Sequence, residues 1–258
     1  MGAMDSQRDL IERAAKRLAP AQSILFVTGA GISADSGLPT YRGVGGLYDQ
    51  GETEDGLPIE ACLSGPMFRA EPSRTWKYIR EIEQACRGAK PNTAHARIAE
   101  LERSRERVWV LTQNVDGLHA AAGSEQILDI HGDVHQLICT ACAWRDRVTD
   151  YSEFDGRLAT DTPSCPECGA VIRPDVVLFG ELLPRAKIER LQRELERGFD
   201  AVISIGTTAV FPYISAPVLA TRAAGGLTIE INPGTSEVSD LVDIHLRLGA
   251  AAAMQALV

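Results

Sequence analysis

Short apolar runs alternate along the chain with segments of helical periodicity. The runs are typical of buried parallel strands and cover residues 23–28, 108–112, 201–205 and 227–231. The helical patterns occupy residues 5–19, 71–86, 93–104, 185–197 and 215–223. This alternation predicts an α/β fold, a Rossmann-like doubly wound parallel sheet with helices on both faces.

One region interrupts this rhythm. Residues 136–172 are rich in Cys, Asp, Thr and Pro and show little helical periodicity. We therefore expect a small domain inserted into the Rossmann-like one. The predicted organisation is a first segment at residues 4–135, the insertion at 136–172 and a second segment at 173–258. A further irregular stretch, residues 43–65, is long enough to be a functional loop.

Four of the six cysteines form two Cys-x2-Cys pairs within the insertion, Cys139 with Cys142 and Cys165 with Cys168. In a chain without a secretion signal, this spacing favours zinc over free or disulfide-linked thiols. Four thiolates complete a tetrahedral zinc shell and leave no open position for water or substrate. The insertion is therefore predicted to be a zinc ribbon that holds one structural zinc per chain.

Composition restricts the partners. A formal net charge of -9 disfavours nonspecific binding to nucleic acid and favours basic partners, although it also fits a protein that is acidic for solubility alone. No run approaches the ~18 apolar residues of a membrane span, and no signal peptide is recognisable. We expect no direct nucleic acid or membrane partner and a cytoplasmic location.

The first apolar run leads into Gly29-Ala30-Gly31-Ile32-Ser33-Ala34, which fits the pattern G-x-G-x-x-[GA]. Glycines there let the backbone approach a pyrophosphate, but so short a match also fits a plain tight turn. A dehydrogenase would carry an acidic residue after a second strand about 20 residues on. Asp49 and Glu52 fall instead in a glycine-rich loop, which disfavours a dehydrogenase.

The glycine run continues to Gly43 as GAGISADSGLPTYRG, and this stretch resembles the signature of the sirtuin family. Tyr41 stands where the family usually has Phe. Further blocks follow in the family's order: TQNVDGLH at residues 112–119, His131-Gly132 before the cysteine quartet, and VVLFGE at residues 176–181. The resemblance extends from about Ile24 to the C-terminus.

The resemblance implies an NAD-dependent protein-lysine deacylase with acyl-lysine proteins or peptides as partners. The acyl oxygen would attack the ribose carbon that bears nicotinamide, and the products would be free lysine, nicotinamide and O-acyl-ADP-ribose. Open alternatives are an ADP-ribosyltransferase or NAD hydrolase, a lysine desuccinylase or demalonylase, and a non-enzymatic NAD-sensing module. Among these activities, we expect lysine deacetylation.

The resemblance also assigns the catalytic residues. His131 would be the general base that deprotonates the nicotinamide ribose, a task that suits an imidazole pKa of about 6.5. Without the family context, a lone histidine there would more often have a structural role than a catalytic one. Asn114 and Asp116 would line the nicotinamide pocket, whereas their pattern alone also fits an Asx turn.

Contacts with NAD are implied for residues at the carboxyl ends of the predicted strands and in the loops beyond. They are Gly29, Ala30, Gly31, Ser33, Ala34, Tyr41, Arg42, Gln113, Asn114, Val115, Asp116, Gly206, Thr207, Thr208, Asn232, Pro233 and Ala250. Thr208 replaces the family's usual serine and keeps a hydroxyl. The following segment, residues 209–212, is one residue shorter than the family norm.

Substrate contacts are implied for Val177, Phe179 and Gly180, because the family pairs this segment with an extended substrate backbone. The pattern alone also fits another core strand. A desuccinylating branch of the family carries Tyr-x-x-Arg on a helix, where both side chains reach a carboxylate. Aligned on Arg80 and Glu81, this chain has Trp76 and Ile79 in those places, which favours a neutral acyl group.

Overall fold

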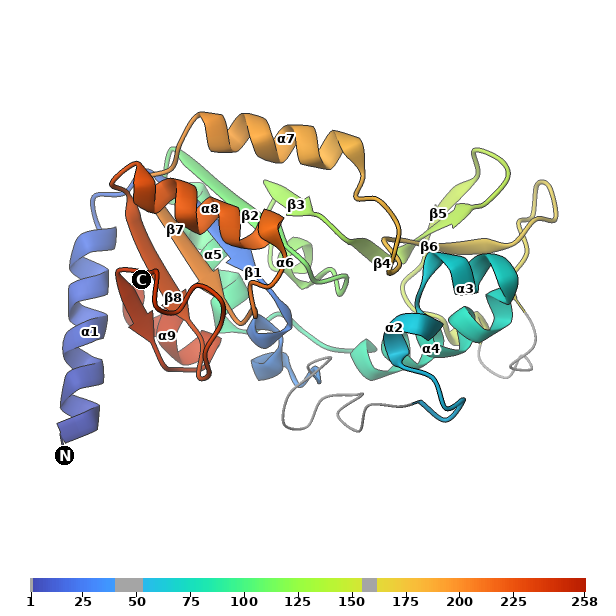
Figure 1. The fold of residues 1–258 in the computed structure, drawn as a ribbon, viewed down its shortest axis with the longest axis horizontal. Coiled ribbons are helices and arrows are strands. Elements are labelled where there is room, and N and C mark those ends of the chain that lie inside the picture. The colour runs from blue at the N-terminus through green and yellow to red at the C-terminus, as the bar shows by residue number, and fades with distance from the viewer. Residues whose placement is uncertain (1, 40–52, 155–161) are drawn as a thin grey trace.

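The structure, a computed structural model, describes residues 2–39, 53–154 and 162–258. Two parts lie side by side along the long axis of the molecule (Figure 1). The larger part contains a six-stranded parallel sheet with helices on both sides, and the smaller part contains a three-stranded antiparallel sheet. Of the helices in the described ranges, none is both long enough and apolar enough to cross a membrane.

The parallel sheet has the strand order β3-β2-β1-β7-β8-β9. Its strands are β1 (Ser23–Thr28), β2 (Arg107–Thr112), β3 (Ile127–Asp129), β7 (Ala201–Ile205), β8 (Leu227–Ile231) and β9 (Ile244–Leu246). Counted within this sheet, the order is 3-2-1-4-5-6, so the predicted doubly wound fold is confirmed. The order reverses between β1 and β7. Open α/β sheets bind their ligands at the carboxyl ends of strands at such a switch point.

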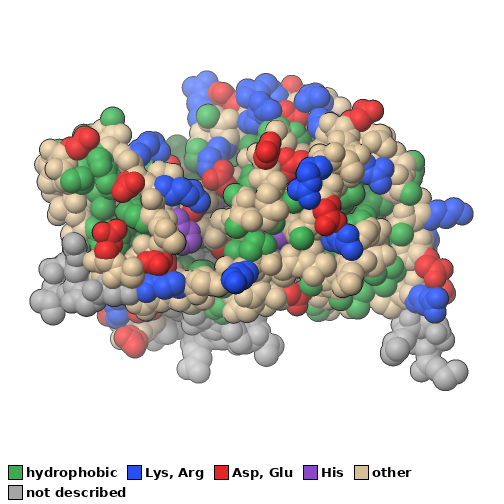
Figure 2. Space-filling view, turned by 180° about the vertical axis from the view of Figure 1, so that it is seen from behind, with side chains coloured by type: hydrophobic (Ala, Val, Ile, Leu, Met, Phe, Trp, Pro, Cys, Tyr) green, Lys and Arg blue, Asp and Glu red, His purple; other side chains and the backbone are tan. Residues whose placement is uncertain are grey.

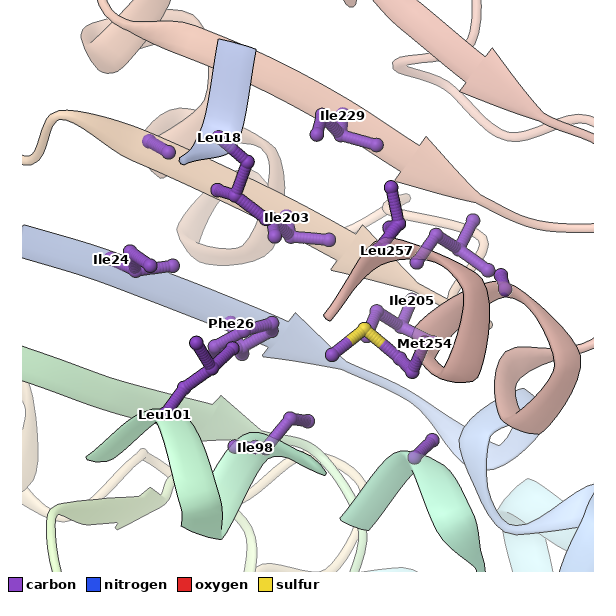
Figure 3. Close-up of a cluster of buried hydrophobic side chains, with 14 of the residues drawn as sticks. Leu18, Ile24, Phe26, Ile98, Leu101, Ile203, Ile205, Ile229, Met254 and Leu257 are labelled. Carbon is purple, nitrogen blue, oxygen red and sulfur yellow. The ribbon is translucent and has the colours of Figure 1, made fainter. Parts of the chain in front are cut away.

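Side chains of the central strands alternate between two apolar layers. On β1, Ile24 and Phe26 join one core cluster, and Leu25 and Val27 join another. The first cluster packs the sheet against α1 (Gly2–Leu18), α5 (Thr93–Ser104) and α9 (Ala250–Leu257), as Figure 3 shows in part. The second packs it against α7 (Arg185–Glu196) and α8 (Pro212–Ala223). Because both faces are covered, the strands are mostly apolar, which is why the sequence pattern revealed them.

The smaller part has its own core. Its sheet has the order β5-β4-β6, with β4 (Gly132–Cys139), β5 (Arg145–Arg147) and β6 (Ile172–Val176). Against it pack three helices, α2 (Ile59–Cys62), α3 (Gly65–Ala70) and α4 (Pro72–Cys86). Trp76 of α4 is fully buried against Tyr151 and Phe154, and its indole N–H donates to the carbonyl of Ile172 at 2.9 Å.

Helices α2 to α4 therefore share a core with the residues around the cysteines, although they precede β2 in the chain. The domain boundaries that the sequence suggested stay a prediction. The stretch at residues 43–65, expected to be irregular, contains the short helix α2. Tyr41 and Arg42, both predicted to contact NAD, lie outside the described residues.

Candidate active site

Two turns interlock at the switch point of the sheet. The N–H of Gly29 donates to the carbonyl of Ile205 at 3.0 Å, and the N–H of Gly31 donates to the carbonyl of Gly206 at 2.9 Å. A Cβ on Gly31 would lie 2.6 Å from the Cα of Gly206, and Gly206 itself has a φ of 58°. Glycine is therefore required at both positions for the turns to approach each other.

The backbone that follows Gly29 differs from the one expected of a dehydrogenase. It forms two 3-10 turns, Ala30–Ile32 and Ala34–Ser36, where a dinucleotide-binding helix would begin. A side chain from outside the turns supports them: Asn92, which caps α5, donates to the carbonyl of Ile32 at 2.7 Å and to the hydroxyl of Ser36 at 3.0 Å. This contribution of Asn92 was not predicted.

Ser33, Asn114 and Asp116 meet beside the first turn. The Ser33 hydroxyl donates to Asp116 at 2.7 Å, and the amide of Asn114 donates to Ser33 at 3.2 Å and to the carbonyl of Gly29 at 3.1 Å. Asp116 also accepts from the N–H of Leu118, so the Asx turn that the sequence allowed is present. A cavity of about 220 Å³ lies against Asn114 and Asp116.

A second chain of contacts crosses from β2 to β7 and β8. The side-chain amide of Gln113 donates to the Thr207 hydroxyl at 2.8 Å, and the amide of Asn232 donates to the Thr207 carbonyl at 3.1 Å. Three turns that the sequence placed after separate strands are thus tied together. Thr207 is the buried centre of this arrangement.

His131 lies between β3 and β4, with both ring nitrogens engaged. Its Nδ1 is 3.0 Å from the carbonyl oxygen of Gln113, and its Nε2 is 2.8 Å from the hydroxyl of Tyr213. Burial lowers the pKa of His131 from the ordinary 6.5, the Gln113 contact raises it, and the charge of Lys187 lowers it. The imidazole is therefore largely neutral at pH 7, as a general base has to be.

The remaining residues predicted to bind NAD lie in the turns after β1, β2, β7 and β8 and at the start of α9. Val115 accepts a main-chain bond from Val134, and Thr208 is exposed and accepts one from Glu237. Ala34 and Pro233 are exposed, and Ala30 is half-buried. Ala250 begins α9 with its side chain in the core.

The segment predicted to bind substrate follows β6. The N–H of Val177 donates to the carbonyl of His131 at 2.8 Å, so this segment is attached directly to the histidine. The main chain of Phe179 pairs with Leu63 and Gly65, whereas its side chain is 44% exposed. Gly180 has a φ of 79°, and this left-handed residue ends the extended segment. A substrate backbone would have to pair with the edge of the segment opposite Leu63 and Gly65.

The two parts of the molecule meet at this site. Figure 2 shows a hollow between them in which a histidine surfaces. His131 follows the large sheet and immediately precedes β4 of the small one. The site therefore lies where the chain passes from the large sheet to the small one.

Two further histidines, His95 and His119, are buried next to the end of β1. His119 contacts the Thr28 hydroxyl at 3.0 Å through Nε2, and its ring packs edge-on against that of His95 with centroids 4.8 Å apart. Burial lowers the pKa of His119 to about 3, so it stays neutral. Both rings are buried, which fits a structural role.

The four cysteines of the insertion converge at the end of β4. Their sulfur atoms all lie within 4.8 Å of one another, with Cys139 and Cys168 at 3.4 Å and Cys142 and Cys165 at 3.6 Å. A tetrahedral zinc with Zn–S bonds of about 2.3 Å would place sulfurs roughly 3.8 Å apart. Main-chain N–H groups of Ala141 and Cys142 also point at the sulfur of Cys139. The donor set fits a closed structural zinc site.

Comparison with known proteins identifies the family. The Sir2 family model matches residues 29–212. "NAD-dependent protein deacylase 2" of Pseudomonas syringae pv. tomato is 54% identical over 248 residues, which cover 95% of this chain and 98% of that protein. "NAD-dependent protein deacylase" of Thermococcus sibiricus is 36% identical over 250 residues, covering 96% and 95%.

Solved structures agree. A Sir2 homologue in complex with NAD has a TM-score of 0.82 and 36% identity, covering 95% of this chain and 91% of that one. A Sir2 structure with a deacetylated p53 peptide and 3′-O-acetyl ADP ribose has a TM-score of 0.84 and 27% identity, covering 96% of both chains. The interlocked glycine turns, the histidine held by Gln113 and the cysteine quartet thus have a common explanation: this chain belongs to the Sir2 family, the sirtuins.

Proposed function

We propose that this chain is an NAD-dependent protein deacylase that removes acyl groups from lysine side chains. The observation that carries the proposal is the convergence of His131, Gln113 and the pair Asn114 and Asp116 at the switch point of the sheet. A neutral histidine there could accept a proton from a bound nucleotide, which supports the proposal. Relatives of 51–54% identity that carry the name "NAD-dependent protein deacylase 2" support it.

The donor set around the glycine turns fits NAD. When bound, NAD supplies a ribose carbon that becomes electrophilic because it bears a positively charged nicotinamide. Asn114 and Asp116 are held by Ser33 and would line the nicotinamide end. Gln113, Thr207 and Asn232 would hold the ribose and adenosine parts, since their polar groups meet where three strands end.

His131 would take the proton from a ribose hydroxyl. The developing positive charge on the ring is stabilised by the Gln113 carbonyl, which already contacts Nδ1. Val177 ties the substrate segment to the same residue through its main-chain bond to His131. The exposed ring of Phe179 would then pack against the acyl-lysine chain.

The Cys139, Cys142, Cys165 and Cys168 cluster would hold one zinc ion that stabilises the small sheet. A closed shell of four thiolates has no vacant position, so the metal would take no part in the chemistry. Thiols stay reduced and available to zinc in the cytoplasm, where we propose that the protein acts.

Product analysis tests the proposed function. We expect the protein, incubated with NAD and an acetyl-lysine peptide, to yield free lysine, nicotinamide and O-acetyl-ADP-ribose in equal amounts. Protein-bound ADP-ribose would instead show a transferase, and free ADP-ribose alone would show an NAD hydrolase. Absence of turnover with a panel of acyl peptides would leave only NAD binding and contradict the proposal.

The side chains of α4 bear on which acyl group is removed. Trp76 and Ile79 are buried in the smaller core, and the guanidinium of Arg80 lies 5.8 Å over the Trp76 ring. The Tyr78 hydroxyl donates to Asp55 at 2.7 Å. The Tyr78 hydroxyl and the Arg80 guanidinium therefore already contact other residues of the smaller part.

We therefore expect kcat/KM for an acetyl-lysine peptide to exceed that for the matched succinyl-lysine peptide by about tenfold or more. The reason is that a carboxylate buried without a cationic partner loses its hydration uncompensated, and tenfold corresponds to about 1.4 kcal/mol. Side-by-side kinetics on one peptide sequence measures the ratio. Faster desuccinylation that is lost in Arg80→Met would show that Arg80 binds the acid, contrary to this expectation.

A further inference from the structure

The short segment after Thr207 brings an aromatic hydroxyl onto the histidine. Tyr213 lies in the first turn of α8, and its hydroxyl is 2.8 Å from Nε2 of His131, 82 residues away in the chain. The ring of Phe211 stacks on Tyr213 with an interplanar angle of 12°. Both rings stand edge-on to the imidazole, with centroids 6.3 and 6.0 Å away. This aromatic pair borders the base on one side.

The chemistry of the two partners of His131 determines the direction of each hydrogen bond. The carbonyl oxygen of Gln113 can only accept, so Nδ1 must carry a proton. In the neutral imidazole the lone pair then lies on Nε2, and the Tyr213 hydroxyl donates to it. Burial raises the pKa of Tyr213, so the hydroxyl keeps its proton at neutral pH.

The backbone that carries Tyr213 is anchored to the same glutamine. The Gln113 side chain holds the Thr207 hydroxyl, which also accepts the N–H of Ala209 at 3.1 Å. Ala209 has a φ of 54°, and no other non-glycine residue of the described ranges has a positive φ. This left-handed residue redirects the chain toward α8. Gln113 thus positions His131 through its main chain and the segment leading to Tyr213 through its side chain.

We propose that Tyr213 is a positioning residue for the base: its hydroxyl holds the Nδ1-protonated tautomer of His131 with the lone pair at Nε2 until a substrate hydroxyl replaces it. The identity of that hydroxyl, a ribose one, rests on the proposed function. In the step itself the ribose O–H bond breaks and its proton moves to Nε2. Tyr213 stays protonated and withdraws, and Nδ1 keeps its bond to Gln113.

The charged groups that act on His131 lie on α7 and β3. Lys187 of α7 is paired with Asp129 of β3 at 2.9 Å, and its positive charge opposes protonation of His131. This pair is untouched by a change at Tyr213. A shift in the pKa of His131 upon removal of the Tyr213 hydroxyl therefore reports the hydrogen bond itself.

The test is a ¹⁵N NMR titration of the histidine rings in the full chain without NAD, comparing wild type with Tyr213→Phe. His131→Ala assigns the signal. We expect the wild-type ring to be the Nδ1–H tautomer. In Tyr213→Phe the pKa of His131 should rise by roughly half to one unit, because the neutral form loses a hydrogen bond of ordinary strength.

Tyr78→Phe is the matched control, since it removes a hydroxyl that is bonded to Asp55 in the smaller part. It should leave the pKa of His131 unchanged. An Nε2–H tautomer in the wild type overturns the proposal without any variant, and so does an unchanged pKa in folded Tyr213→Phe.

A kinetic readout separates this inference from the proposed function. The acid limb of the kcat/KM profile against pH should move upward in Tyr213→Phe by the same amount as the NMR pKa. If the acid limb of the kcat/KM profile is the same in Tyr213→Phe as in the wild type while deacylation proceeds, the proposal that a ribose hydroxyl replaces Tyr213 at Nε2 is contradicted. A wild type that does not deacylate would contradict the proposed function alone, and the NMR titration would still decide the role of Tyr213.

Discussion

Replacing His131 with alanine should lower kcat/KM for deacylation by about 10²-fold or more, the scale expected for loss of a general base. NAD affinity should change little, because the side chains that would hold the nucleotide bond to other groups, Gln113 to Thr207 and Asn114 to Ser33 and Gly29. Only the main-chain carbonyl of Gln113 contacts the imidazole. Peptide kinetics together with calorimetric titration of NAD measure the two effects separately.

His135→Ala provides the matched control. His135 lies four residues further along on β4, 3.6 Å from a carboxylate oxygen of Asp133, and it should be dispensable for deacylation. Full activity in folded His131→Ala would remove His131 from the mechanism. A parallel loss of NAD binding would show that the imidazole supports the nucleotide site rather than the chemistry.

Loss of a cysteine from the quartet should have the largest effect on stability. We expect about one zinc per chain in the wild type and a marked loss of zinc in Cys139→Ala and Cys165→Ala. Binding of the metal is coupled to folding of its ligands, so the small sheet should unfold with it. Tm should fall by about 10 °C or more, because each kcal/mol lost shifts Tm by roughly 2–4 °C in a chain of this size.

Cys86→Ala is the control, because this half-buried thiol lies outside the quartet. It should retain zinc and nearly the full Tm. Chelation should reduce activity only as near-UV circular dichroism and fluorescence report loss of structure. Rapid inactivation of a fully folded protein that zinc restores would indicate a catalytic metal and contradict the structural assignment.

The sequence by itself determined the large sheet and the metal site. The central strands are buried on both faces, so each is a mostly apolar run that stands out between helical patterns. By contrast, β3 and β9 have three residues each, too few to show any period. The Cys-x2-Cys pairs were recognisable because ligand spacing within a pair is local and does not depend on the rest of the fold.

Only the tertiary structure decided which side chains support the site and which parts share a core. Asn92 reaches Ile32 across 60 residues, and Tyr213 reaches His131 across 82. Helices α2 to α4 bury their apolar faces on the small sheet, although an amphipathic pattern alone does not say which surface it will meet. The physical reason is that a local pattern determines the form of an element, whereas a hydrogen bond between distant residues depends on packing of the whole chain to within a few tenths of an ångström.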